Sequence, residues 1–362
     1  MLADVFDAER LQCFSSTYAE SRAKFLQACQ LNCCVMDWFQ HPCLGPDGEA
    51  IGTDVAVLGP TLAPKQLVII SGTHGLEGYC GAAIQQAVLE QFDFSKLPGN
   101  ISIAFIHGLN PYGFAWNRRV DENNVDLNRN FIDWNAPLAP NPWYGSVHDI
   151  LFAAEPYADA LNAFITQQGV AAMEQALTCG QHTHGDGLFY GGTGPSWSNQ
   201  LVQTLSEKVF CHASELAIID IHSGLGPYGY GQPISFDHPH SRGLRNAKKW
   251  YGPALGSPRV AATITADLKG TLYDGLHALF PDTPLTSIAL EFGTYSKSEG
   301  IARLRDEALA WHDATPPSDT RATDALKDFF YVNKRDWKES VLFRGKQIVQ
   351  QAIHGLTEDN SP

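Results

Sequence analysis

The sequence has no stretch of about 18 consecutive apolar residues, the length that a helix needs to cross a membrane. Its first residues, MLADVFDAERLQCF, carry acidic groups where a secretory signal peptide has basic residues followed by an apolar run. None of the 8 cysteines forms a CxxC pair, so we expect reduced thiols that pack as small hydrophobic side chains. These absences predict a cytoplasmic protein without a membrane segment.

Basic residues are outnumbered: the chain has 25 lysines and arginines against 39 aspartates and glutamates, and its formal net charge is -14. A chain this acidic gains no affinity for phosphate backbones from counterion release, so we do not expect nucleic acid as a partner. Because 44% of the residues are hydrophobic and only 18% are charged, the composition is that of a folded protein. The 362 residues contain no internal repeat and suffice for one large domain or two ordinary ones.

Short apolar runs alternate with segments of helical spacing. The apolar runs predict buried strands at residues 66–70 (QLVII), 101–106 (ISIAFI), 216–221 (LAIIDI) and 287–291 (SIALE). Helices are expected over about 15–31, 79–92, 146–178 and 198–210, and beyond residue 297 with a break at residues 315–319 (TPPSD). This alternation is typical of an α/β sheet covered by helices on both faces. We expect an N-terminal extension, residues 1–50, packed on a catalytic domain, residues 51–362.

Residue types that bind zinc follow two of these predicted strands. His74 and Glu77 stand in SGTHGLEG directly after strand 66–70, where glycines permit a sharp turn, and His222 follows strand 216–221. Two imidazoles and one carboxylate leave the fourth position of a tetrahedral zinc ion open, as in catalytic zinc sites. Because α/β sheets bind ligands at the carboxyl ends of their strands, we expect one zinc ion held by these three residues.

Each of these residues also has a plainer structural explanation. A lone HxxE pair is typical of a surface pair or a helix cap, and an isolated strand-end histidine often bonds to a backbone carbonyl.

Asp220 shares a strand face with His222 and is a candidate outer partner of its imidazole. Glu291 ends an apolar strand, where it would serve either in an ion pair with an arginine or as the general base of a zinc hydrolase.

A polar loop rich in arginine and asparagine lies between the first and third predicted ligands. It contains Arg118 and Arg119, and then the run VDLNRNF with Asn128 and Arg129. The planar fork of arginine matches a carboxylate or a developing oxyanion, so the loop is a candidate substrate-binding segment. The alternative is a polar loop whose arginines offset neighbouring acidic residues.

The order of these elements resembles the zinc carboxypeptidase family. The resemblance spans residues 67–295. Its elements, in order along the chain, are the HxxE of His74 and Glu77, the run NPYG, Arg119 seven residues before the aspartate of VDLNRNF, the pair His222-Ser223, and Glu291. The runs RRVDENNVDLNRNF, GLFYGG with the following PSWSN, and ALEFGT look like an uncharacterised bacterial branch of that family. That branch borders the aspartoacylase and succinylglutamate desuccinylase group, which acts on small N-acyl amino acids.

The resemblance implies a three-layer α/β/α sandwich around a mixed, mainly eight-stranded sheet, with one Zn²⁺ ion in the site. The site residues that it implies are His74, Glu77 and His222 for the metal, Glu291 as general base, Arg119 for the oxyanion with Arg118 as the alternative, and Asn128 and Arg129 for a terminal carboxylate.

The substrate-binding tyrosine of the digestive carboxypeptidases has one candidate counterpart, Tyr273, whose place relative to the neighbouring glycine differs from the family pattern. His182 and His184 in QHTHGD suggest either a second metal or, more simply, a loop beside GLFYGG that lines the cleft. His238 and His240 raise the same question.

Three functions fit this reading. The first is a zinc metallopeptidase of the carboxypeptidase type that cleaves small peptides, and the second is a deacylase of N-acyl amino acids that uses the same site. The third is a metal-binding module without catalysis, which the complete set of ligands, arginines and glutamate argues against. The sequence therefore predicts a zinc-dependent hydrolase of amide bonds.

Overall fold

The computed structural model describes residues 8–153, 157–260 and 268–358, and the statements below refer to these residues. The first part of the run TITADLKGTLYDG, which precedes Tyr273, lies outside them.

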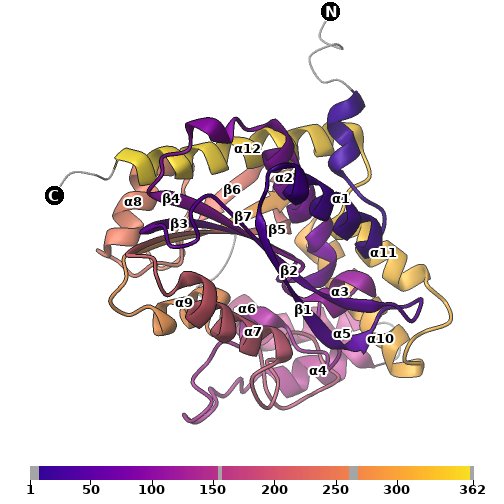
Figure 1. Cartoon of the computed structure of the whole chain (residues 1–362). Helices are drawn as coiled ribbons and strands as arrows, with labels where there is room; N and C mark the ends of the chain where they lie inside the picture. The colour runs from indigo at the N-terminus through magenta and orange to yellow at the C-terminus, as the bar shows by residue number, and fades with distance from the viewer. Residues whose placement is uncertain (1–7, 154–156, 261–267, 359–362) are drawn as a thin grey trace, which may run out of the picture.

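A seven-stranded mixed sheet crosses the molecule in the order β1-β2-β4-β3-β5-β7-β6 (Figure 1). Neighbours among β4, β3, β5 and β7 are parallel, whereas β1, β2 and β6 pair antiparallel. The strands are β1 Val35–Leu44, β2 Ala50–Leu58, β3 Lys65–Ser71, β4 Ile101–His107, β5 Glu215–Tyr228, β6 Gly231–Ile234 and β7 Leu285–Gly293. The α/β architecture is confirmed, and the described residues form seven strands where the resemblance implied about eight.

The central strands are apolar throughout because helices cover both faces of the sheet. Leu67 and Ile69 of β3 belong to one buried cluster, whereas Val68 and Ile70 belong to another. Successive side chains of a strand point to opposite faces, so each cluster fills one of the two spaces between sheet and helices. Figure 1 shows α2 and α12 on one side of the sheet and α7 and α9 on the other.

The predicted helices are present, with two of them divided. The segment expected as one helix over 146–178 forms three, and Gly169, with φ +89, separates the second from the third. The helix expected over 198–210 becomes a π-helical turn at Ser206–Phe210. The α-helices are α1 Tyr18–Leu31, α2 Gly78–Gln91, α3 Pro111–Ala115, α4 Tyr144–Phe152, α5 Tyr157–Gln168, α6 Val170–Thr178, α7 Trp197–Leu205, α8 Arg242–Tyr251, α9 Leu272–Leu279, α10 Lys297–Asp313, α11 Arg321–Phe330 and α12 Arg335–Glu358. None of the described helices has the length and apolar character that a membrane crossing demands.

The N-terminal fifty residues contribute to the sheet. Strand β1 lies at its edge and is hydrogen-bonded to β2, with Val35 opposite Val57 and Phe39 opposite Thr53. Most of its side chains are exposed, which explains why the sequence carries no buried apolar run there.

Parallel strands place the predicted site. The carboxyl ends of β3, β5 and β7 lie at the same edge of the sheet, because β3 is parallel to β5 and β5 to β7. The turn after β3, the end of β5 and the end of β7 therefore meet there.

Candidate metal centre and its cavity

The turn after β3 carries two of the predicted ligands. Gly72 has φ +73, which glycine tolerates and most side chains do not. A Cβ at Gly75 would collide with the backbone of Gly113, so the turn fits closely against α3. His74 precedes the short 3₁₀ turn Gly75–Glu77, and α2 begins immediately after it. The glycines of SGTHGLEG thus hold His74 and Glu77 at the start of a buried helix.

His222 and Glu291 come from adjacent strands. In the parallel pairing of β5 with β7, His222 is the direct partner of Glu291. Two residues that are far apart in the sequence are therefore neighbours across one rung of the sheet. The backbone N–H of Leu225 donates a hydrogen bond of 3.0 Å to Oε1 of Glu291 and fixes that carboxylate at the cavity wall.

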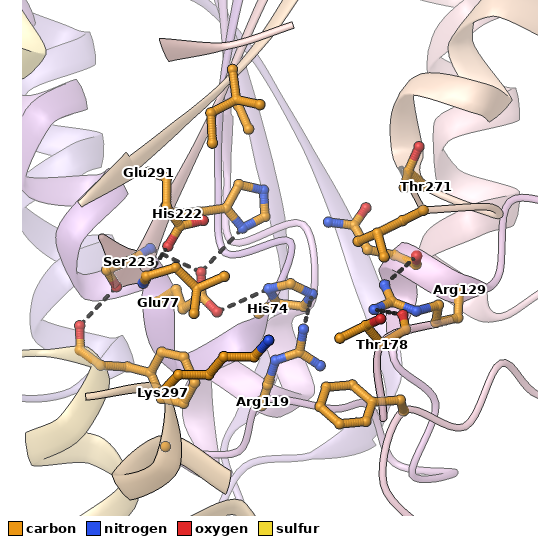
Figure 2. A pocket seen from close by; sticks show the side chains of 18 of the residues that line it. His74, Glu77, Arg119, Arg129, Thr178, His222, Ser223, Thr271, Glu291 and Lys297 are labelled. Carbon is orange, nitrogen blue, oxygen red and sulfur yellow. Dashed lines mark hydrogen bonds and ion pairs between the residues drawn. The ribbon is translucent and has the colours of Figure 1, made fainter. Parts of the chain in front are cut away.

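The three predicted ligands converge on one point. Nδ1 of His74 lies 2.9 Å from Oε1 of Glu77, and Nδ1 of His222 lies 3.1 Å from Oε2 (Figure 2). One ligand atom from each residue lies within 4.8 Å of the others, and all three side chains are buried. Within the described ranges, no other group of three histidine, cysteine or acidic residues has this geometry. Two imidazole nitrogens and one carboxylate are a donor set that suits a divalent transition metal, so these residues could hold a metal ion.

A buried carboxylate holds the far nitrogen of each imidazole. Nε2 of His74 lies 3.1 Å from Oδ1 of Asp126, and Nε2 of His222 lies 2.7 Å from Oδ2 of Asp220. Metal-binding histidines commonly have their second nitrogen bonded to a carboxylate, which fixes the ring and leaves the first nitrogen for the metal. Asp220 occupies the position expected from the sequence. Nothing in the sequence indicated that Asp126 would serve the other histidine.

The charges of the site keep its inner carboxylate ionised. Burial alone would raise the pKa of Glu77, but His74 and His222 beside it hold the pKa below its usual range. Burial and the nearby charge of Glu77 raise the pKa of Glu291 to about 7. The two glutamates therefore differ: Glu77 is a permanent anion, and Glu291 is able to take up and release a proton near neutral pH.

The side chains of the adjacent residues Arg118 and Arg119 point in different directions. Arg119 lines the cavity, donates to Oδ2 of Asp126 through Nη1, and places Nη2 2.9 Å from Nε2 of His74. Arg118 points elsewhere: its Nε donates a 2.6 Å hydrogen bond to Glu307 of α10, and its guanidinium lies over the ring of Trp311. Arg118 is not among the residues that line the cavity, contrary to its assignment as the alternative substrate-binding arginine.

Asn128 and Arg129 both line the cavity, and both are fixed by backbone groups. Oδ1 of Asn128 accepts a 2.9 Å bond from the N–H of Leu272 at the start of α9. Arg129 donates to the carbonyl of Asn128 at 2.8 Å and to that of Thr178 at 2.7 Å. The ring of Phe189, in the GLFYGG loop, lies 5.4 Å from the guanidinium carbon of Arg119 and 5.7 Å from that of Arg129. One aromatic side chain thus borders both cavity-lining arginines.

Tyr273 lines the cavity and also contacts the partner of a predicted ligand. Its ring is buried and stacks on Phe236 at 5.0 Å, and its hydroxyl donates a 3.3 Å bond to Oδ2 of Asp220. The hydroxyl therefore supports the carboxylate that holds His222.

The other histidine pairs lie outside the metal centre. Nδ1 of His182 lies 2.8 Å from the carbonyl of Gly192, and Nδ1 of His184 lies 2.8 Å from the hydroxyl of Thr183. Neither pair suggested by the sequence, His182 with His184 or His238 with His240, belongs to a three-residue metal-binding group among the described residues.

The candidate centre opens into a cavity of about 430 Å³. Besides the residues above, apolar side chains from α10, α11, β6 and β7 line it. Lys297, the first residue of α10, lines it (Figure 2). Glu174 of α6 lines it as well, and Nζ of Lys297 lies 3.9 Å from Oε1 of Glu174. Neither residue stands in a recognisable motif, so no pattern in the sequence pointed to them.

Residues 14–344 match a family described as "Protein of unknown function (DUF2817)". The chain belongs to the DUF2817 family. No curated protein sequence matches it. The DUF2817 chain is similar in fold to bovine thrombin-activatable fibrinolysis inhibitor in complex with a tick carboxypeptidase inhibitor, with 12% identity, a TM-score of 0.51, and coverage of 97% of this chain and 100% of the other.

A second similar structure is carboxypeptidase A from Helicoverpa armigera, with 12% identity, a TM-score of 0.50, and coverage of 99% of the DUF2817 chain and 78% of the other. An aspartoacylase family protein from Mesorhizobium loti has 15% identity and covers 76% and 67%, but its TM-score of 0.37 is too low for an argument. These likenesses confirm the carboxypeptidase-like fold that the sequence motifs implied. At such low identity they show the fold alone, and the chemistry of the DUF2817 site rests on its own residues.

Proposed function

We propose that this protein is a zinc-dependent hydrolase of amide bonds, most similar in action to a metallo-carboxypeptidase that cleaves small peptides. His74, Glu77 and His222 would hold one zinc ion, and Glu291 would be the general base. The fold supports a metallohydrolase, because its carboxypeptidase-like neighbours share the architecture over nearly the whole chain.

One observation carries the proposal: a carboxylate that lines the cavity stands directly beside the three converging ligands. Glu291 is the β-sheet partner of His222, and its pKa is raised to about 7 by burial and by Glu77. A group that only balanced charge would pair with a cation, yet the carboxylate of Glu291 accepts its hydrogen bond from the Leu225 amide. General bases work best when their pKa lies near the working pH.

Zinc, when bound, supplies a Lewis acid for the substrate carbonyl and lowers the pKa of a coordinated water. The protein's own residues would complete the reaction. Glu291 would accept a proton from the attacking water and later return it to the leaving nitrogen, so that the carboxylate ends the cycle as it began. Arg119, fixed by Asp126 at the cavity wall, would face the negative charge that develops on the carbonyl oxygen.

Arg129 and Asn128 would receive the terminal carboxylate of the substrate. The guanidinium of Arg129 is held by two backbone carbonyls, so little side-chain entropy is lost when a ligand binds. A cavity of about 430 Å³ has the size of a small-molecule pocket. This limited volume also favours a second candidate, a deacylase of N-acyl amino acids, whose substrates carry the same amide and the same free carboxylate.

The test is Glu291→Gln in the zinc-loaded protein. We expect the variant to bind zinc with unchanged stoichiometry and to lose about 10²- to 10⁴-fold in kcat, the usual contribution of a general base. Glu215→Gln is a matched control, because Glu215 is a buried glutamate of the same sheet at the opposite end of β5, where it pairs with Lys65. The control should keep its activity.

Hydrolysis is measured on a panel of short peptides and N-acyl amino acids, and zinc by elemental analysis. Full activity in Glu291→Gln would refute the assigned base. Metal-loaded wild-type protein that hydrolyses no amide would refute the enzymatic proposal and favour a non-catalytic metal-binding module.

A further inference from the structure

Three of the 8 cysteines stand where α1 ends and β1 begins. Cys29 lies in the last turn of α1, Cys33 follows the C-cap residue Asn32, and Cys34 immediately precedes β1. The side chain of Cys29 is buried, that of Cys33 is exposed, and that of Cys34 is partly exposed. None of the three lines the cavity of the candidate metal centre, so the function proposed for that site does not account for them.

The backbone at this junction has the hydrogen bonds of a Schellman motif. The N–H of Cys33 donates to the carbonyl of Gln30 at 3.1 Å. The N–H of Cys34 donates to the carbonyl of Cys29, also at 3.1 Å. Cys33 has φ +53, the left-handed conformation that this motif requires of the residue after the C-cap. The motif commonly brings the side chains at its two ends into contact, and these are the side chains of Cys29 and Cys34.

The hydrogen bond from Cys34 to Cys29 limits the separation of the two residues. Standard bond lengths on either side of it hold the two Cα atoms at most about 7 Å apart. Disulfides usually span Cα separations of roughly 4.4–6.8 Å. The two thiols are hydrogen-bonded to each other, and Cys34 packs against the buried apolar cluster that contains Cys29. A disulfide could therefore join Cys29 and Cys34 with little movement of the backbone.

Cys33 is less suited to either partner. The Cα atoms of adjacent residues such as Cys33 and Cys34 are about 3.8 Å apart, which is shorter than an ordinary disulfide spans. The side chain of Cys33 is exposed, whereas that of Cys29 has no exposed surface, so these two thiols lie in different surroundings. Of the three cysteines, Cys29 and Cys34 are therefore the pair that the fold places ready for bonding.

The two thiols differ in their access to solvent and in their acidity. Cys29 is fully buried, and only Cys34 of this pair can meet a reagent from solution. The hydrogen bond between the thiols, together with burial, raises the pKa of Cys29. The same hydrogen bond lowers the pKa of Cys34. Because the thiolate is the reactive form of cysteine, Cys34 is the thiol that reacts first with an oxidant.

We propose that Cys29 and Cys34 are a dithiol that hydrogen peroxide converts into a disulfide between the end of α1 and the start of β1. The thiolate of Cys34 attacks one oxygen of the peroxide and the O–O bond breaks. The other oxygen leaves and takes a proton to become water, and Cys34 becomes a sulfenic acid. The sulfur of Cys29 then attacks the sulfur of Cys34, the S–O bond breaks, and the hydroxyl leaves with the thiol proton as water. One peroxide is reduced to two waters, and a dithiol reductant reverses the change.

The experiment treats the reduced full chain with hydrogen peroxide, then unfolds it in urea with a maleimide that caps the remaining thiols, and maps the products by mass spectrometry. We expect two capped thiols fewer than the 8 of the untreated protein, with a disulfide between residues 29 and 34. Dithiothreitol should restore both thiols. Cys29→Ala should instead stop at the sulfenic acid of Cys34, which dimedone traps.

Cys34→Ser should lose the disulfide, and Cys33→Ser is the matched control that should keep it. These two substitutions change side chains that are not fully buried, so they decide the question even if Cys29→Ala does not fold. The exposed thiols of Cys179 and Cys211 are internal controls and should still be capped after the treatment. A chain that keeps all its thiols, a disulfide through Cys33, or oxidation of Cys179 and Cys211 as fast as that of Cys34 would overturn the proposal.

Discussion

Asp126 and Asp220 each hold the imidazole of one proposed metal ligand, so replacing them by asparagine tests the proposed metal centre without changing His74, Glu77 or His222. In Asp220→Asn, the amide oxygen can still accept from Nε2 of His222, but the negative charge that strengthens the imidazole as a ligand is lost. Loss of such an outer carboxylate typically weakens metal binding about 10- to 100-fold. We expect both variants to show a loss of zinc affinity in that range.

The two variants should differ in the stability of the metal-free protein. Asp126 also accepts from Arg119 and lies 3.9 Å from Arg129, whereas the additional partners of Asp220 are the neutral hydroxyls of Thr73 and Tyr273. Asp126→Asn leaves the buried Arg129 and the partly buried Arg119 without their carboxylate, which costs roughly 3 kcal/mol or more of unfolding free energy. Asp220→Asn weakens hydrogen bonds to a carboxylate and costs about 2 kcal/mol.

Zinc affinity is measured by competition with a chromophoric chelator, and unfolding free energy by urea denaturation of chelator-treated protein. Zinc affinity in Asp220→Asn equal to that of the wild type would refute the assignment of His222 as a ligand supported by that carboxylate. If metal-free Asp126→Asn and Asp220→Asn have the same free energy of unfolding, Asp126 does not stabilise the protein through its charge on the two arginines.

Three further outcomes are expected. Burial and the charge of Glu122 raise the pKa of Asp121 to about 7 in the folded protein, whereas an unfolded aspartate has a pKa of about 4. Because the folded state binds this proton more tightly, the contribution of Asp121 to the free energy of unfolding is lost as the pH rises from about 4 to 7. At pH 8 the free energy of unfolding of Asp121→Asn should therefore exceed that of the wild type by up to roughly 4 kcal/mol, and at low pH the two should be equal. Urea unfolding of both proteins at the two pH values measures this difference. A difference that does not change with pH would contradict the prediction. Gly300→Ala would bring a Cβ within 2.7 Å of the Phe329 ring and should lower the free energy of unfolding by about 1–3 kcal/mol. Gly99→Ala is the control and should leave the free energy of unfolding unchanged, because no atom lies within 4 Å of the added Cβ. Removal of zinc by a chelator should abolish hydrolysis and leave the circular dichroism spectrum unchanged, because buried strands position the ligands; unfolding on chelation would show that the metal is structural.

The sequence predicted four strands of the sheet, β3, β4, β5 and β7, which helices cover on both faces. The four central strands were expected within one or two residues at their starts, because a strand covered by helices on both sides needs an unbroken apolar run. Strands β1, β2 and β6 were missed, β2 although most of its residues are buried. β1 lies at the sheet edge with mostly exposed side chains and contains Pro42, and β6 has only four residues, so neither carries a periodic apolar signal.

The metal ligands could be proposed because all three stand next to such strands. What the sequence could not provide was the partner of each side chain. His74 and Asp126 are 52 residues apart, and only the packing of the loop against the first turn brings them together. The adjacent Arg118 and Arg119 look equivalent in the sequence, yet the backbone turns one toward Glu307 and the other toward the cavity.

Asp126 contacts His74 on one side and Arg119 on the other, with Arg129 close by. A metal ion held by His74 as proposed would draw electron density from the imidazole and strengthen its bond to Asp126, and less of the negative charge of Asp126 would then be left for the arginines. Binding of the metal and binding of an anionic ligand would therefore be thermodynamically linked through one carboxylate. By reciprocity, whatever factor the metal imposed on the affinity for an anionic product, the product would impose on the affinity for the metal. The retention of zinc during dialysis should consequently depend on whether product is present.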